Sequence, residues 1–215
     1  MQGIPFSPDV WKAKLRVLKE KGEAQTRRLS GLKEINQSPN DWELELILEN
    51  EKFKGIACFL PKGRSNPTLV KYVKPPYHIG ETYYVKEAWA VEKKYNHLKP
   101  SEIPETATIY YESDGVGEWP INLSIGKWRS PMFMSAWAAR HFITITGIKA
   151  ERLQSITDRE AIAEGIDFSC TQPDSGCGCN RRAFARLWNS LNPQYPWSLN
   201  PWVFAYTLKL VERDV

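Results

Sequence analysis

The feature that most constrains the fold is a repeated alternation of apolar and polar residues in short runs, separated by glycine and proline. Such alternation predicts strands, because successive side chains of a strand point to opposite faces. Gly147 lies inside one of these runs and is expected to divide it into two strands. The chain is therefore predicted to contain sheets of short strands, with candidate strands at 42–49, 53–60, 68–73, 82–92, 107–111, 141–156 and 200–212.

Three helices are expected among these strands. The first begins after Ser7, a residue suited to the N-cap, and ends at Gly22. The second follows Thr157, which has the spacing of a capping box with Glu160. Apolar residues at helical spacing predict the third helix at 181–191. Short strands with helices at intervals indicate the α+β class, built as a small mixed β-barrel or half-barrel with flanking helices.

The length of 215 residues and the hydrophobic content of 42% allow a substantial core within one domain. We expect a single domain over 1–215, with a β-rich insertion near 31–74 and a loop rich in cysteine and glycine near 167–180. No apolar run approaches the roughly 18 residues of a membrane helix, and the first residues lack the apolar stretch of a signal peptide. A cytoplasmic protein without membrane contact is therefore expected.

Three of the four cysteines, Cys170, Cys177 and Cys179, cluster in the expected loop. In a cytoplasmic chain they are not expected to form stable disulfides. Structural zinc sites usually combine two short pairs of ligands, and here the second pair is missing, with His141 the only plausible distant fourth ligand. Because that second pair is missing, the sequence favours a polar loop without metal, and no cofactor is expected.

The aromatic residues are more informative than the charge. The formal net charge of +4 is small, whereas nine tryptophans are many for a chain of this size. Two of them lie in the stretch KWRSPMFMSAWAAR at 127–140, and basic stretches with aromatic rings are typical of proteins that bind phosphates and unstacked bases. We assign Lys127, Trp128 and Arg129 to a ligand site. Met132, Phe133 and Met134 are assigned mainly to packing, and Arg140 could take either role.

The order and spacing of several blocks of sequence point to a family. These blocks are 6–29, 75–90, 127–166, 184–190 and 197–210. Together they resemble the ASCH family of the PUA-like superfamily, in the variant common in bacteriophage and prophage genomes. The resemblance implies a PUA-like barrel with a cleft, in a protein encoded by a phage or prophage inside a bacterial host. It also implies that the ligand belongs to RNA or nucleotides, often with modified bases.

Small relatives in that family include an amidohydrolase that removes an acetyl group from modified cytidine, and others are proposed as ribonucleases. For the amidohydrolase type, the resemblance implies a lysine, a threonine nucleophile three residues later and a glutamate in the cleft. Thr26 matches the threonine, but Glu23 stands at the lysine position, so the motif lysine is absent. Glu87 is the candidate cleft carboxylate, and the alternative is a structural ion pair with Arg27 or Arg28.

The leading hypothesis is binding of a nucleic acid or nucleotide, with RNA favoured, in a basic cleft lined by aromatic residues. One alternative is an amidohydrolase or ribonuclease that uses Thr26 with Glu87 or Glu23. The other is a phage interaction or assembly protein that has no nucleic-acid ligand. The sequence leaves the oligomeric state open. The residues assigned to ligand binding are Arg27, Arg28, Lys86, Trp89, Lys127, Trp128, Arg129 and Arg140.

Overall fold

The protein is described by a computed structural model over residues 1–48, 55–63, 69–115, 124–167 and 178–211. Its centre is a five-stranded sheet in the order β1-β6-β9-β10-β2. The first pair is parallel and the other neighbours are antiparallel. The strands are β1 (Gly3–Pro5), β6 (Thr82–Lys86), β9 (Phe142–Arg152), β10 (Trp202–Leu210) and β2 (Ala24–Arg28).

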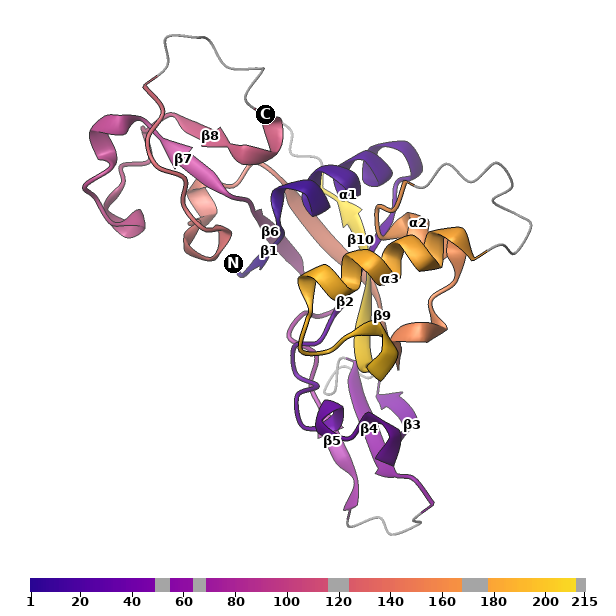
Figure 1. Cartoon of the computed structure of the whole chain (residues 1–215). Helices are drawn as coiled ribbons and strands as arrows, with labels where there is room; N and C mark the ends of the chain where they lie inside the picture. Colours follow the sequence, from indigo (N-terminus) through magenta and orange to yellow (C-terminus); the bar gives the residue numbers. More distant parts are fainter. Residues whose placement is uncertain (49–54, 64–68, 116–123, 168–177, 212–215) are drawn as a thin grey trace.

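Two smaller sheets project from the central sheet as arms (Figure 1). One arm is a three-stranded antiparallel sheet, and the other is a two-stranded antiparallel pair. The first contains β3 (Trp42–Leu48), β4 (Ile56–Pro61) and β5 (Lys71–Val73), and the second contains β7 (Trp89–Val91) and β8 (Ile109–Tyr111). The β-rich segment predicted near 31–74 thus forms a sheet of its own.

Three helices lie over one face of the central sheet (Figure 1), namely α1 (Pro8–Lys21), α2 (Asp158–Ala163) and α3 (Cys179–Leu191). Gly22 ends α1 in the left-handed conformation, and Thr157 and Glu160 form the predicted capping box of α2. Ser7 occupies the N-cap position of α1 but makes no side-chain capping bond. The α+β class is confirmed. Within the described ranges, no helix is long and apolar enough to cross a membrane.

The segment predicted as two strands joined at Gly147 is a single long strand, β9, so that prediction is wrong. The register shows why: Thr207 of β10 pairs with Gly147, but Leu208 pairs with Ile145. One extra residue of β9 is therefore absorbed as a bulge. A glycine within an alternating run marks such a bulge as readily as it marks a turn.

The central sheet is open between its two edge strands, β1 and β2, and we call this gap the seam. No strand ladder in the described residues joins the two edges, so the strand pairing by itself does not close a barrel. A side chain spans the gap instead, because Arg28 Nη2 at the end of β2 donates to Pro5 O of β1 at 2.9 Å. The seam lies under α1, which connects the two edge strands in the sequence.

The buried apolar residues form three clusters. The largest fills the space between the central sheet, α1 and the β3–β5 arm, and includes Trp11 and Phe204. A second lies within the β7–β8 arm around Trp89 and Met134, and a third between α2, α3 and the sheet includes Trp188. The β3–β5 arm therefore shares the central core, the β7–β8 arm has a core of its own, and the buried charges of Lys14, Arg27 and Glu164 lie beside the seam.

Candidate functional site

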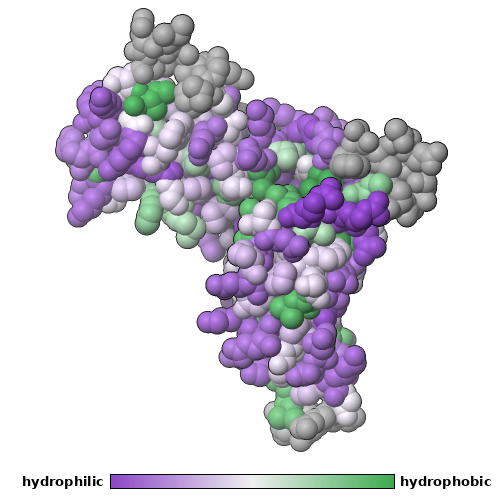
Figure 2. All heavy atoms as spheres, in the orientation of Figure 1, coloured by the Kyte–Doolittle hydropathy of each residue, from purple (hydrophilic) through white to green (hydrophobic). Residues whose placement is uncertain are grey.

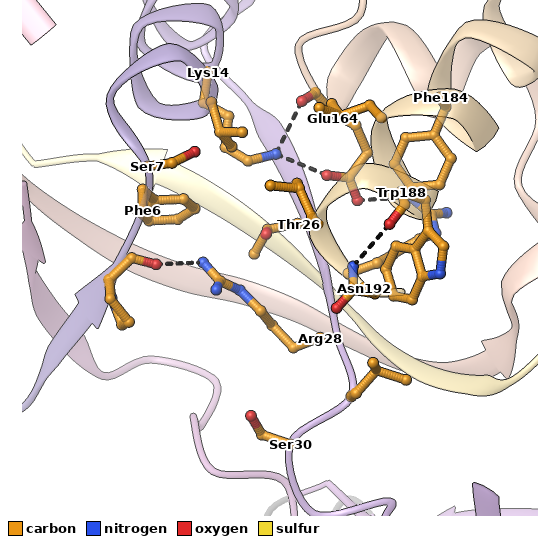
Figure 3. Close-up of a pocket in the computed structure, with 16 residues that line it drawn as sticks. Phe6, Ser7, Lys14, Thr26, Arg28, Ser30, Glu164, Phe184, Trp188 and Asn192 are labelled. Atoms are coloured by element: carbon orange, nitrogen blue, oxygen red, sulfur yellow. Dashed lines mark hydrogen bonds and ion pairs between the residues drawn. The ribbon is translucent and has the colours of Figure 1, made fainter. Parts of the chain in front are cut away.

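A cavity of about 320 Å³ opens at the seam, and we call it the seam cavity. Its walls are the ends of β1 and β2, the buried side of α1, the residue after α2 and one face of α3. Figure 3 shows Lys14, Thr26, Arg28 and Glu164 arranged around it. In Figure 2, hydrophobic side chains gather in the furrow between α1 and α3, with hydrophilic side chains around them. The cavity thus combines apolar walls with a few charged groups.

Lys14 brings a buried ammonium group to the cavity. It follows Trp11 by three residues and precedes Leu18 by four, so it shares the buried face of α1. Its Nζ donates to Gln25 O at 2.5 Å, to Glu164 O at 3.0 Å and to Glu164 Oε2 at 2.7 Å. Burial lowers the pKa of Lys14, and the attraction of Glu164 only partly offsets this. All three donors of the ammonium group are therefore engaged within the protein.

Arg27 is neutralised by carboxylates of the protein. Its guanidinium lies 2.7 Å from Glu151, 3.4 Å from Glu160 and 3.1 Å from Glu164. Burial alone would raise the pKa of Glu164, but Lys14 and Arg27 outweigh it and hold that pKa below its usual value. The sequence assigned Arg27 to the ligand, whereas in the structure its charge stabilises the wall of the cavity.

Arg28 differs from its neighbour because no carboxylate of the described residues lies within ion-pair distance of it. Its guanidinium packs 4.6 Å from the ring centre of Phe6 and donates to Pro5 O. Its Nε has no hydrogen-bond partner within the described ranges, and burial lowers the pKa of the group. The hydroxyl-bearing residues Thr26 and Ser30 line the same cavity. A partly buried cation beside hydroxyl groups is suited to an anionic or strongly polar ligand.

Glu87, the predicted cleft carboxylate, lies in a different cluster. It accepts hydrogen bonds from Ser113 Oγ at 2.6 Å and from Arg140 at 3.1 Å and 3.2 Å, and it lies 3.1 Å from His141 Nδ1. Arg140 also pairs with Asp114 at 2.6 Å. Burial would raise the pKa of Glu87, but these hydrogen bonds outweigh it and lower the pKa to about 2. The alternative given for Glu87, an ion pair with Arg27 or Arg28, is wrong in its partner, because Glu87 pairs with Arg140.

The Glu87 cluster has a structural role that its neighbours explain. Glu87 lies between β6 and β7, Ser113 and Asp114 follow β8, and Arg140 precedes β9. The guanidinium of Arg140 stacks 3.8 Å from the ring centre of Tyr111 in β8. The cluster thus ties the β7–β8 arm to the central sheet. Arg140, which the sequence left between a ligand role and a packing role, takes the packing role.

A second hollow, of about 480 Å³, lies against the segment Pro5–Ser7 that also lines the seam cavity, and we call it the shelf. Its other walls include Glu112, Trp128 and Met132. Trp128 is 41% exposed, in agreement with its assignment to a ligand surface. Met132 and Phe133 are 61% and 64% exposed, so the packing role predicted for them is wrong: they lie on a short turn, Pro131–Phe133, outside the core.

The remaining basic and aromatic candidates near the shelf divide between surface and core. Lys127 is exposed, and Lys86 Nζ donates to Met132 O at 2.9 Å. Trp89 is fully buried in the core of the β7–β8 arm, so it cannot stack on a ligand in this structure. The side chain of Arg129 is buried against the Trp89 ring. Packing of the arm therefore replaces the ligand role predicted for Trp89, whereas Arg129 packs in the arm and also lines the shelf.

Two further predicted sites lie outside the cavity. Glu23 precedes β2, is about half exposed and pairs with Lys209 at 3.0 Å on the surface. Cys170 and Cys177 fall outside the described residues, while Cys179 begins α3. Among the residues that the structure describes, no group of three or more histidine, cysteine, aspartate or glutamate residues is arranged to hold a metal ion.

The structure thus brings together only part of the predicted cleft. Thr26, Arg27 and Arg28 meet in the seam cavity, whereas Glu87 does not line it. Sequence reasoning missed Lys14 and Glu164 as site residues. The signal for Lys14 was present, because a lysine within an apolar helical stripe must be buried and paired. No comparable signal marked Glu164, which lies 150 positions further along the chain.

No family model, no curated protein and no solved structure matches this chain.

Proposed function

We propose that the protein binds a nucleotide unit, with RNA as the favoured source, in the seam cavity of a PUA-like barrel. The observation that carries the proposal is Arg28, a partly buried guanidinium that has no carboxylate partner among the described residues and lines a cavity beside hydroxyl groups. A charge that is partly removed from water and has no partner is costly, so the site is suited to a ligand that supplies negative charge or strong acceptors.

The walls of the cavity match the rest of a nucleotide. Phe6 lies on one side, and Phe184 and Trp188 of α3 lie on the other. Each of these three side chains is only 4% exposed, so they give the cavity apolar walls and not open ring faces. Apolar walls suit a base, and a volume of about 320 Å³ is at the small end of ligand sites. The resemblance to ASCH proteins supports the same ligand class and the barrel. The seam is then the mouth of that barrel, and Arg28 lies at it.

Isothermal titration calorimetry with the four ribonucleoside 5′-monophosphates and the matching nucleosides tests this proposal. We expect a monophosphate to bind the wild type and Arg28→Ala to weaken that binding about tenfold. Arg28→Lys should retain part of the affinity, because it keeps the charge but not the fork of donors. Lys209→Ala is the matched control, since it removes one positive charge from β10 beside the start of β2, at the end away from Arg28.

The outcomes separate the proposal from the interaction-protein alternative. No binding of any nucleotide or short RNA by the wild type would overturn the proposal and favour an interaction protein without such a ligand. Equal losses in Arg28→Ala and Lys209→Ala would also contradict it, because the effect would then come from net charge and not from the cavity.

A second candidate is hydrolysis of an acyl group from a modified base. The observation that favours it is the presence of Lys14 in the same cavity as Thr26. Glu23 stands at the position of the motif lysine, and Lys14 of α1 would supply the missing amine from another part of the chain. In this reaction Thr26 Oγ attacks the acyl carbonyl, Lys14 takes the hydroxyl proton and passes it to the departing amine, and water then releases the acid from Thr26. The lowered pKa of Lys14 favours the neutral amine that this step needs.

Binding remains the better supported function, because Lys14 donates to three acceptors and must break one contact to act as a base. Acetate release from N4-acetylcytidine distinguishes the two candidates. If hydrolysis occurs, Thr26→Ala should abolish acetate release while cytidine binding persists. Release that survives Thr26→Ala would remove this candidate and leave binding unaffected.

A further inference from the structure

We propose that the shelf is a second base subsite, so that the ligand is a single strand of at least two nucleotides. One base occupies the seam cavity, and its neighbour in the strand stacks on Trp128. This inference rests on the proposed function and goes beyond it, because it assigns a second site and defines the ligand as an oligonucleotide.

The first observation is that the two hollows share a wall. Pro5, Phe6 and Ser7 line both the seam cavity and the shelf. A ligand that extends from the cavity over this short segment therefore reaches the shelf. Arg28 lies on the cavity side of the same segment, where it donates to Pro5 O. A phosphate that links the two nucleotides would pass over this segment near Arg28, which has no carboxylate partner among the described residues.

The second observation is the chemistry of the shelf. Trp128 offers an indole ring that is 41% exposed, and Pro131 and Met132 add apolar surface. Glu112 also lines the hollow, and a carboxylate repels phosphate but accepts hydrogen bonds from the exocyclic amino group of a base. Arg129 lines the hollow as well, and its Nε has no hydrogen-bond partner among the described residues. The shelf thus offers an acceptor and a donor beside an apolar ring, which suits the polar edge and the flat face of a base.

The third observation is that the exposed apolar turn is held in place. Lys86 Nζ donates to Met132 O at 2.9 Å, and Ser130 Oγ accepts from the Met132 amide at 3.4 Å. The main chain at Arg129 pairs with that at Trp89 through two hydrogen bonds of 2.8 Å and 3.2 Å. Apolar side chains on an ordered surface turn form a prearranged platform, which loses little entropy when a base stacks on it.

Calorimetry with four 5′-phosphorylated ribonucleotides and the four corresponding 5′-phosphorylated homodinucleotides tests the inference. The wild type should bind at least one dinucleotide about tenfold more tightly than its mononucleotide. Trp128→Ala should remove this gain and leave mononucleotide affinity unchanged, and Trp128→Phe should retain part of it because phenylalanine keeps an aromatic face. Phe133→Ala is the matched control, since Phe133 is exposed on the same turn but does not line the shelf.

The result patterns are distinct. Mononucleotide binding without any gain for the dinucleotides would overturn the second subsite and leave the proposed function intact. A gain that Trp128→Ala and Phe133→Ala reduce equally would also overturn it, because the apolar turn would then act without a defined base position. No binding of either class would remove the proposed function, and with it this inference.

Discussion

At the scale of single residues, the buried charges are held by partners from distant segments: Lys14 of α1 pairs with Glu164 after α2, and Glu87 pairs with Arg140. Thr26 and Arg28 were predicted as site residues, and both line the seam cavity. Lys14 and Glu164 were not, because their pairing depends on the approach of α1 to the end of α2, which no local pattern encodes. Local patterns identify which residues are unusual, whereas the choice of ion-pair partners is made by tertiary structure.

Glu87 provides a test of one buried charge through pH. Its pKa in the folded protein is about 2, below the ordinary value of 4.5, so its ionised form stabilises the fold above about pH 4.5. That contribution, about 3 kcal/mol, is lost as pH falls through 4 toward 2, because the unfolded chain binds the proton first. Glu87→Gln should therefore be less stable than the wild type at pH 7, and the difference should shrink at pH 3.5.

Urea unfolding at pH 7, pH 5 and pH 3.5 measures this difference in the free energy of unfolding. Glu102→Gln serves as the control, because that carboxylate is half exposed and its replacement should change stability by less than about 0.5 kcal/mol. If the deficit of Glu87→Gln stayed constant over the three pH values, the contribution of Glu87 would come from packing and not from its charge.

At the scale of elements, the sequence predicted helix ends better than strand ends. The capping box of α2 and the glycine that ends α1 are local signals, and both were confirmed. The break expected at Gly147 and the packing expected of Met132 and Phe133 were wrong, because strand register and the course of a surface turn depend on partners far away in the sequence. The ends of α2 matter for the proposed site, because Glu164, which pairs with Lys14 at the seam cavity, is the residue that follows α2.

The two helix N-termini offer a matched comparison. Thr157 Oγ1 accepts the Glu160 amide of α2, whereas Ser7 makes no side-chain capping bond to α1. Thr157→Ala should therefore lower the free energy of unfolding by about 1 kcal/mol, and Ser7→Ala should change it by much less. Thermal unfolding followed by circular dichroism measures both. Equal losses would show that the capping bond of α2 adds nothing beyond the N-cap position.

At the scale of the whole molecule, the distribution of charge is more informative than the net value of +4. Lys14, Arg27 and Arg140 are paired with carboxylates inside the protein, so their charges do not attract phosphates. Within the described part of the chain, the cations near the proposed ligand that lack a carboxylate partner are Arg28, Lys86, Lys127 and Arg129, of which Arg129 is buried against Trp89. A ligand held this way relies on a shaped cavity and a stacking surface, with only a few phosphate contacts.

This arrangement predicts a shallow salt dependence. For a five-nucleotide single-stranded RNA, neutralisation of three phosphates gives a slope of about −2 for the logarithm of the affinity against the logarithm of the salt concentration. Titrations at several potassium chloride concentrations measure it. Lys127→Ala should reduce the slope by about 0.7, whereas Lys209→Ala should leave it unchanged. A slope steeper than about −5 would mean that a broad basic surface binds the RNA, and that the seam cavity and the shelf do not determine its affinity.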